Sequence, residues 1–160
     1  SFNDTLENTK QPPARVWKEW KSPLIPKYWG TNKAVGSLKL KEGSSDDYYV
    51  ELEKGILTQW YTAAPSGKLR ITLSAKGHGT FGVWAGIYNN PPRNARGYPQ
   101  YKVDGKPLAK HQSYNIDSDQ WKPFSFECDY KVGDRVYVYL MQQKGTISFD
   151  DVIVSPYSDK

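Results

Sequence analysis

The chain has 160 residues, which suits a single domain that can bury a core without disulfides. Its one cysteine, Cys128, excludes an internal disulfide and a cluster of thiolate metal ligands. The 22 Lys and Arg residues outnumber the 17 Asp and Glu residues by five, but they are scattered from Lys10 to Lys160, which argues against a nucleic-acid-binding protein. No apolar run approaches the roughly 20 residues of a membrane span, so no membrane insertion is expected.

Short segments that alternate apolar and polar residues run through the chain, and no longer segment keeps a helical period. Strands are predicted, in chain order, at Ser37–Leu40, Tyr48–Leu52, Ile56–Ala63, Lys68–Lys76, Phe81–Tyr88, Pro123–Tyr130, Arg135–Met141 and Thr146–Val154. Hairpin turns are predicted at 132–134 and 143–145. This pattern predicts one all-β domain over residues 1–160, built as a two-sheet antiparallel jelly-roll β-sandwich.

One long interruption separates these strands. Residues 89–119 are rich in Pro and Gly and have too little periodicity for a core strand. We expect a long loop there, either functional or mobile.

Motifs in four parts of the chain, in the expected order, are similar to those of jelly-roll carbohydrate-binding modules of families four, sixteen and twenty-two. They are the opening Phe2-Asn3-Asp4-Thr5-Leu6-Glu7, the strand Ile56–Gln59 with the turn Pro65-Ser66-Gly67, the segment Trp121-Lys122-Pro123-Phe124 with Phe126, and the closing Ile147-Ser148-Phe149-Asp150-Asp151-Val152. The opening departs from the commoner Phe-Glu in having Leu6 before Glu7.

The resemblance implies a non-catalytic module that binds a polysaccharide, neutral or acidic. It further implies that the module is monomeric and lies outside the cell or at its surface. The module would be part of a larger secreted protein that also carries a polysaccharide-active enzyme. It also implies a structural calcium ion, for which the matching positions are Glu7, Lys41 and Gly43 in the turn 41–45, Asp150 and Asp151. Calcium takes six to eight oxygen ligands in irregular geometry; the alternative is that Glu7 is exposed and an Asp caps a turn.

The aromatic content of 14% points to a sugar-binding surface, because sugar rings stack their apolar faces on aromatic rings. Trp84 is the leading platform, since it lies opposite Phe81 and Val83 in its strand and is flanked by glycines. The alternative is that the phase is inverted and Trp84 is in the core. Further candidate ligand-binding residues on strands are Tyr88, Tyr137, Tyr139, Arg70, Ser74, Lys76 and Gln142.

The predicted loop adds Arg93, Arg96 and Tyr98 as candidates, because Arg forms bidentate bonds with carboxylate or sulfate while Tyr stacks on a ring. A solvated loop without ligand is the alternative. Other residues have structural predictions: Trp121 is expected to pack in the sandwich, and the tryptophans of the first thirty residues to cover a sheet edge. Cys128 is expected to be buried and inert.

No enzyme signature accompanies these features. The only histidines, His78 and His111, have no partner at a metal-ligand spacing, and no Gly-x-Ser-x-Gly or phosphate-binding loop occurs. Two alternatives stay open. One is a jelly-roll polysaccharide lyase, which the segment 84–89 faintly resembles although its companion motifs are absent. The other is a cell-surface adhesion or protein-interaction domain whose aromatic face binds a protein.

Overall fold

The computed structural model describes residues 2–62, 68–87, 95–96, 102–103, 106–107, 109–129 and 135–156. Its elements are β1 (Thr5–Glu7), the 3-10 helices η1 (Asn8–Lys10) and η2 (Pro13–Arg15), β2 (Leu24–Pro26), β3 (Gly30–Leu40), β4 (Tyr48–Thr62), β5 (Lys68–Ile87), β6 (Lys102–Val103), β7 (Lys106–Pro107), β8 (Ala109–Asp129) and β9 (Arg135–Pro156). The prediction of an all-β chain is confirmed. No helix in the described part is long and apolar enough to span a membrane.

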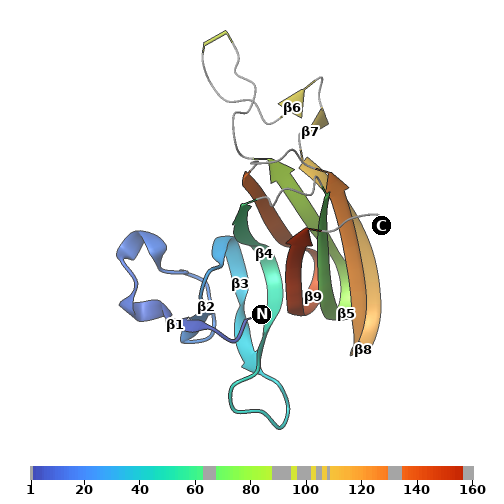
Figure 1. Ribbon diagram of the computed structural model, residues 1–160. Helices are drawn as coiled ribbons and strands as arrows, with labels where there is room; N and C mark the ends of the chain where they lie inside the picture. The colour runs from blue at the N-terminus through green and yellow to red at the C-terminus, as the bar shows by residue number, and fades with distance from the viewer. Residues whose placement is uncertain are drawn as a thin grey trace.

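Five long strands form one antiparallel sheet in the order β3-β4-β9-β5-β8 (Figure 1). The 20-residue strand β5 is central to it, because it pairs with β8 along one side and with β9 along the other. Several pairs change register part-way, as between Ala75 and Gly77 on β5 and between Leu52 and Ile56 on β4.

The long strands fold over at these irregular points. Tyr114 and Phe124 lie ten residues apart on β8, a separation of about 33 Å in a straight strand, yet their ring centroids are 5.2 Å apart. The Tyr114 hydroxyl also donates a 3.1 Å hydrogen bond to the carbonyl of Ser125. Phe81 likewise contacts Phe124 and Phe149, at 5.0 and 5.2 Å. One half of the sheet therefore lies face to face on the other.

The result is a two-layer jelly-roll sandwich. The first layer consists of residues 35–40, 48–52, 68–75, 122–129 and 147–156, and the second layer of residues 30–32, 56–62, 81–87, 109–115 and 135–142. Side chains that point between the layers form the core, and the largest of those fully buried include Phe81, Phe149, Leu52 and Leu57. Burial of this apolar surface is the main force that holds the layers together.

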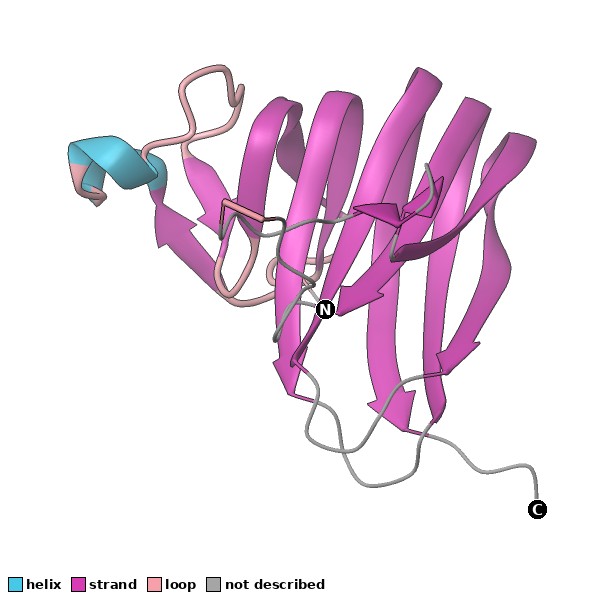
Figure 2. Cartoon of the chain, turned by 90° about the horizontal axis from the view of Figure 1, so that it is seen from above, coloured by secondary structure: helices cyan, strands magenta, loops and turns pink. Residues whose placement is uncertain are grey.

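The N-terminal segment lies against the β3 edge of the sheet. The small β1–β2 sheet and the two 3-10 helices stand beside that edge in both views (Figures 1 and 2). Trp17, Trp20 and Trp29 are buried there in the same hydrophobic cluster as the sandwich core. The prediction that N-terminal tryptophans cover a sheet edge is confirmed, although Tyr28 remains 69% exposed.

Two sequence predictions are wrong. Residues 109–119 are not loop, because β8 begins at Ala109. This strand lies at the edge of the sheet, where most of residues 111–120 are exposed, so its sequence lacks the alternation of a core strand. Residues 143–145 do not form a hairpin turn but lie within β9, where Gly145 has a positive φ of 73° at the point where the strand folds over.

Other predictions have mixed outcomes. Cys128 is buried as expected. Trp121 is not packed between the layers but lies half-buried, edge-on to Tyr49 at 5.3 Å. The predicted turn at 132–134 falls outside the described residues.

Candidate functional site

Aromatic side chains gather on the outer face of the second layer. The phase predicted for β5 is confirmed there: Phe81 and Val83 are fully buried between the layers, and Trp84, half-buried, points to the outer face. In the antiparallel register, Trp84 lies between His111 on β8 and Tyr139 on β9. Period-two alternation thus places three rings from three neighbouring strands in one row.

The rings of this row are in contact. The Trp84 indole stacks on the His111 imidazole, with centroids 4.5 Å apart and planes inclined by 22°. The Tyr139 ring lies 4.7 Å from that of Tyr137, which is next on the same face of β9. We call Trp84, His111, Tyr137 and Tyr139 the aromatic strip.

Glycines on β5 make room for the strip. A β-carbon on Gly86 would lie 2.1 Å from Cζ of Tyr137, so the tyrosine ring lies directly over the glycine backbone. A β-carbon on Gly82 would lie 3.0 Å from Nε2 of Gln143 and 3.5 Å from Nε1 of Trp84. The backbone beside Trp84 is therefore covered by a tyrosine on one side and by a flexible amide on the other.

The indole N–H of Trp84 is buried and has no hydrogen-bond acceptor among the described residues. A buried donor without a partner costs about 1–3 kcal/mol. Nε2 of Gln143 and Nε1 of Trp84 lie 3.0 and 3.5 Å from the same point, the position of a β-carbon on Gly82, and the Gln143 side chain can move because glutamine has three rotatable side-chain bonds. A ligand hydroxyl that displaced the amide would supply the missing acceptor.

Several predicted ligand-binding residues lie on the opposite side of the sandwich. Arg70, Ser74 and Lys76 project from the first layer, alternating with the buried Leu69, Ile71, Leu73 and Ala75. Arg70 forms an ion pair with Glu127 at 2.8 Å. The ammonium of Lys76 lies 4.9 Å from the ring centroids of Tyr49 and Trp121. The structure does not bring these residues to the aromatic strip, because β5 folds over between Ala75 and Phe81.

The remaining candidates divide into two groups. Gln142 lies at the point where β9 folds over, and its amide donates a 2.8 Å hydrogen bond to the carbonyl of Gly145. Arg96 is exposed in a two-residue turn. Tyr88, Arg93 and Tyr98 lie outside the described residues.

Sequence reasoning missed His111 and Gln143. His111 was missed because residues 89–119 were predicted to be a loop. The strand β8, which pairs beside Trp84, was therefore not expected on this face. The available signal was the alternation of Tyr114 and Ile116 on one side of this strand with His111 and Ser113 on the other.

The predicted calcium ligands surround a lysine ammonium. Lys41 forms an ion pair with the buried Asp150, and its Nζ lies 3.9 Å from Oδ2 of both Asp47 and Asp151. The hydrogen bond to Asp150 raises the pKa of Lys41 above its ordinary value. A calcium ion at the same point would meet this positive charge, and Glu7 pairs elsewhere, with Lys10 at 3.0 Å. The arrangement does not fit calcium between these carboxylates, and calcium binding stays a prediction.

Comparison with solved structures places this geometry among known folds. A putative sugar binding protein from Bacteroides thetaiotaomicron superposes with a TM-score of 0.58 at 16% identity, covering 81% of this chain and 87% of that one. The CBM22-1 and GH10 modules of a Clostridium thermocellum xylanase, complexed with xylohexaose, give a TM-score of 0.56 at 9% identity over 82% of this chain and 26% of that one. The chain has the jelly-roll fold of carbohydrate-binding modules.

A third similar structure is TmCBM61 in complex with β-1,4-galactotriose, with a TM-score of 0.52 at 12% identity, covering 82% of this chain and 90% of that one. No family model and no curated protein sequence matches the chain. At these identities the similarity establishes the fold, and the ligand has to be argued from the residues.

Proposed function

We propose that this chain is a non-catalytic carbohydrate-binding module that binds a polysaccharide on the aromatic strip. The observation that carries the proposal is the row His111–Trp84–Tyr139, with Tyr137 beside it, on a solvent-facing sheet surface. Large aromatic rings on an outer sheet face favour a ligand with flat apolar faces. The apolar C–H faces of sugar rings meet this requirement.

Polar groups around the strip suit the hydroxyls of a sugar. The indole N–H of Trp84 lacks an acceptor, the Gln143 amide lies beside it, and Ser113 is exposed on the next row of β8. Sugar hydroxyls both donate and accept hydrogen bonds, so they match amide, indole and hydroxyl partners.

The described histidines are engaged in ways that do not favour catalysis. His111 stacks on Trp84, and both ring nitrogens of His78 bind carboxylates, those of Asp117 and Asp119. The companion motifs of a lyase are also absent from the sequence, so we favour binding over the lyase. By analogy with the xylanase that carries its module beside a GH10 domain, we propose that this chain targets an attached polysaccharide-active enzyme to its substrate outside the cell.

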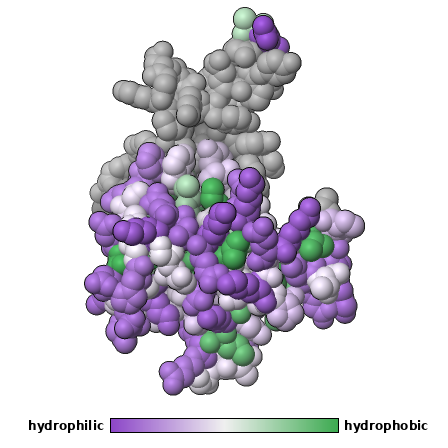
Figure 3. Space-filling view, turned by 180° about the vertical axis from the view of Figure 1, so that it is seen from behind, coloured by the Kyte–Doolittle hydropathy of each residue, from purple (hydrophilic) through white to green (hydrophobic). Residues whose placement is uncertain are grey.

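A protein-interaction domain is the other alternative. Figure 3 shows that, in the described part of the face seen from behind, hydrophobic residues form separate patches among hydrophilic ones. Protein-docking surfaces more often present a continuous apolar patch of several hundred Å². The described part of the face seen from behind has no such continuous patch.

Affinity electrophoresis in gels containing soluble polysaccharides tests the proposal. We expect retardation by at least one β-glucan, xylan, mannan or galactan. Trp84→Ala should weaken retention roughly tenfold, because loss of a stacking platform costs about 1–2 kcal/mol. Trp121→Ala is the matched control, since this half-buried tryptophan lies on the opposite layer. Equal loss of retention in both folded variants would show that the strip is not the binding site.

A further inference from the structure

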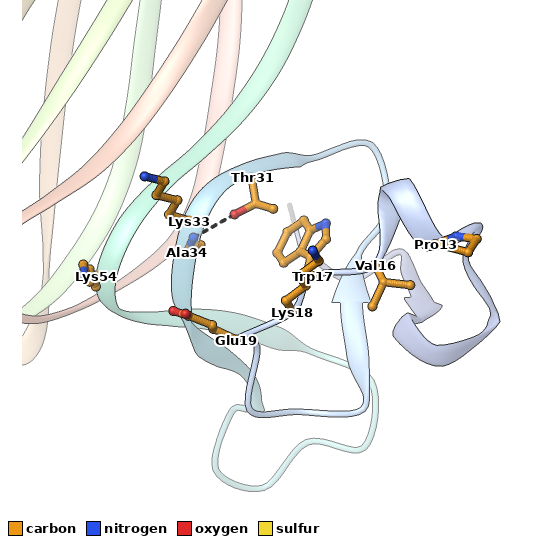
Figure 4. Close-up of a pocket in the computed structure, with 9 residues that line it drawn as sticks. All are labelled: Pro13, Val16, Trp17, Lys18, Glu19, Thr31, Lys33, Ala34 and Lys54. Carbon is orange, nitrogen blue, oxygen red and sulfur yellow. Dashed lines mark hydrogen bonds between the residues drawn. The ribbon is translucent and has the colours of Figure 1, made fainter.

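A separate pocket lies between the N-terminal segment and the outer edge of the sheet. Figure 4 shows Pro13 and Val16 on one side and Lys33 and Lys54, from β3 and β4, on the other, with Trp17 between them. Its volume is about 570 Å³, within the roughly 300–1,000 Å³ of typical small-molecule sites. In the sheet order, β4 lies between β3 and β9, the nearest strand of the aromatic strip, and no residue of the strip lines the pocket. The pocket is therefore distinct from the aromatic strip.

The pocket carries excess positive charge. Lys18, Lys33 and Lys54 line it together with a single acid, Glu19. None of these three lysines has an ion-pair partner within the described residues, whereas Lys10, Lys21, Lys39 and Lys41 each pair with a carboxylate. Three unpaired ammonium groups at one concave site attract an anion.

The wall of the pocket is rigidly built. Trp17 is 6% exposed and packs edge-on against Trp20, with centroids 4.8 Å apart. The buried Asn8 fixes its backbone from both sides, since Asn8 Oδ1 accepts a 2.8 Å hydrogen bond from Trp17 N and Asn8 Nδ2 donates one of 2.9 Å to Trp17 O. The pocket therefore exists before a ligand arrives, which reduces the entropy cost of binding.

The strand side is equally constrained. Lys33 has a positive φ of 54°, which costs about 1–2 kcal/mol in a residue other than glycine. The facing Gly55 permits this bulge, because a β-carbon there would lie 2.4 Å from the carbonyl oxygen of Lys33. The Thr31 hydroxyl completes the bulge by accepting a 3.0 Å hydrogen bond from Ala34 N, shown dashed in Figure 4.

From these features we infer that the pocket formed by Trp17, Lys18, Lys33 and Lys54 binds a saccharide unit that carries a carboxylate or a sulfate. The lysines hold the anionic group. The half-buried Val16 and the small exposed part of Trp17 contact the sugar ring, and the Thr31 hydroxyl can donate a hydrogen bond to a ring substituent. The pocket is larger than an inorganic anion requires, which favours an anion attached to a sugar. The chain would thus have two sugar sites on different parts of its surface.

Two-dimensional ¹H–¹⁵N NMR on the whole chain tests this inference. The probes are an oligogalacturonate for the carboxylate, a sulfated galactan oligosaccharide for the sulfate, a neutral galactan oligosaccharide and inorganic sulfate. At least one acidic oligosaccharide should shift the Trp17 indole signal and the Lys33 and Lys54 amide signals, while the neutral sugar and the free ion leave them unchanged. Equal shifts with inorganic sulfate, or none with either acidic oligosaccharide, would overturn the assignment.

Variants locate the binding. The double variant Lys33→Gln and Lys54→Gln should bind the acidic oligosaccharide with about tenfold lower affinity, because two charge-assisted contacts are lost. Glu19→Gln should strengthen it about twofold to threefold, which gives a second test should the lysine double variant fail to fold. Lys122→Gln, an exposed lysine of the first layer, is the control. Trp84→Ala should leave this affinity intact, and its loss in that variant would assign the acidic ligand to the aromatic strip and refute the second site.

Discussion

The indole of Trp84 and the imidazole of His111 lie stacked across neighbouring strands, with their ring centroids 4.5 Å apart. One face of the indole is therefore occupied by a histidine, and a sugar has to stack on the remaining indole face, on the tyrosines or against the exposed His111 ring. The stack also fixes the orientation of Trp84, whose glycine neighbours on β5 provide no side chain to support it.

We expect His111→Ala to weaken polysaccharide binding by roughly threefold to tenfold, because an aromatic pair contributes about 0.5–1.5 kcal/mol beyond its buried area. The melting temperature should fall by only about 2–5 °C, because the same stack also stabilises the fold but His111 is exposed on an edge strand. Affinity electrophoresis measures the effect, and Lys122→Ala, at an exposed position on the first-layer part of β8, is the control. Unchanged retention would remove His111 from the binding surface.

The two carboxylates that bind His78, those of Asp117 and Asp119, predict a pH dependence of stability. Hydrogen bonds to Asp119, at 2.7 Å from Nε2, and to Asp117 raise the pKa of His78 above its ordinary value of 6.5. Both ring nitrogens donate only in the imidazolium form. Because the folded pKa is the higher one, the stabilisation is complete below about pH 6.5, the unfolded value, and is lost as the pH rises through the folded pKa.

Titration of the His78 ring signals by NMR, with melting curves over the same pH range, checks this prediction. In a variant with both Asp117→Asn and Asp119→Asn, the pKa of His78 should return towards 6.5 and the pH dependence of the melting temperature should flatten. A pKa of His78 at or below 6.5 in the wild-type chain would show that Asp117 and Asp119 do not stabilise its imidazolium form.

The fold-over of β9 depends on Gly145. Its φ is 73°, and a β-carbon would lie 2.0 Å from the carbonyl oxygen of His78, a backbone atom of the facing strand. We expect Gly145→Ala to lower the free energy of unfolding by about 3 kcal/mol or more, combining the cost of the left-handed backbone with a collision that cannot be relieved by a side chain.

Gly43→Ala is the matched control, because Gly43 has a φ of 77° but no atom within 4 Å of its would-be β-carbon. It should cost about 1 kcal/mol from the backbone conformation alone. Urea denaturation of both variants measures the difference. Equal effects would mean that the close approach of the strands at Gly145 does not determine the fold-over.

The ion pair between Lys41 and Asp150 predicts that substitutions at these two residues have strongly non-additive effects on the free energy of unfolding. Asp150 is 2% exposed, so removal of its partner in Lys41→Met leaves a buried carboxylate unpaired, at a cost of about 3–5 kcal/mol. Asp150→Asn in the same chain should restore much of the loss. Denaturation of the two single variants and the double variant measures the coupling as a double-mutant cycle.

A melting curve recorded with and without a chelator tests whether calcium is bound. With Lys41 among the carboxylates, we expect a calcium chelator to leave the wild-type melting temperature unchanged. A clear decrease of the melting temperature on chelation would show that a calcium ion binds the folded chain, because an ion that binds only the folded state raises its melting temperature.

The central strands followed from the sequence, whereas β1, β2 and residues 30–36 of β3 were not predicted. The alternation in Lys68–Lys76 and Phe81–Tyr88 predicted which side chains of β5 are buried, because burial of one sheet face imposes a period of two. The same rule failed for residues 109–119, because in the described residues 111–119 only Ile116 is buried and Tyr114 and Ser118 are half-buried, so the alternation at this sheet edge is weak. Trp121 was misjudged for a related reason, since its contacts with Tyr49 and Lys76 come from distant segments.

The sequence by itself determined the all-β class and the alternation of core and outer side chains along β5, and it favoured the position of Trp84 on an outer face. Only the tertiary structure decided which outer face each residue occupies. Local alternation records that a side chain points outward, but the fold-over of β5 between Ala75 and Phe81 turns its two halves onto opposite sides of the sandwich. Arg70 and Trp84 are therefore separated, and His111 joins Trp84, because long-range strand pairing lies beyond any local pattern.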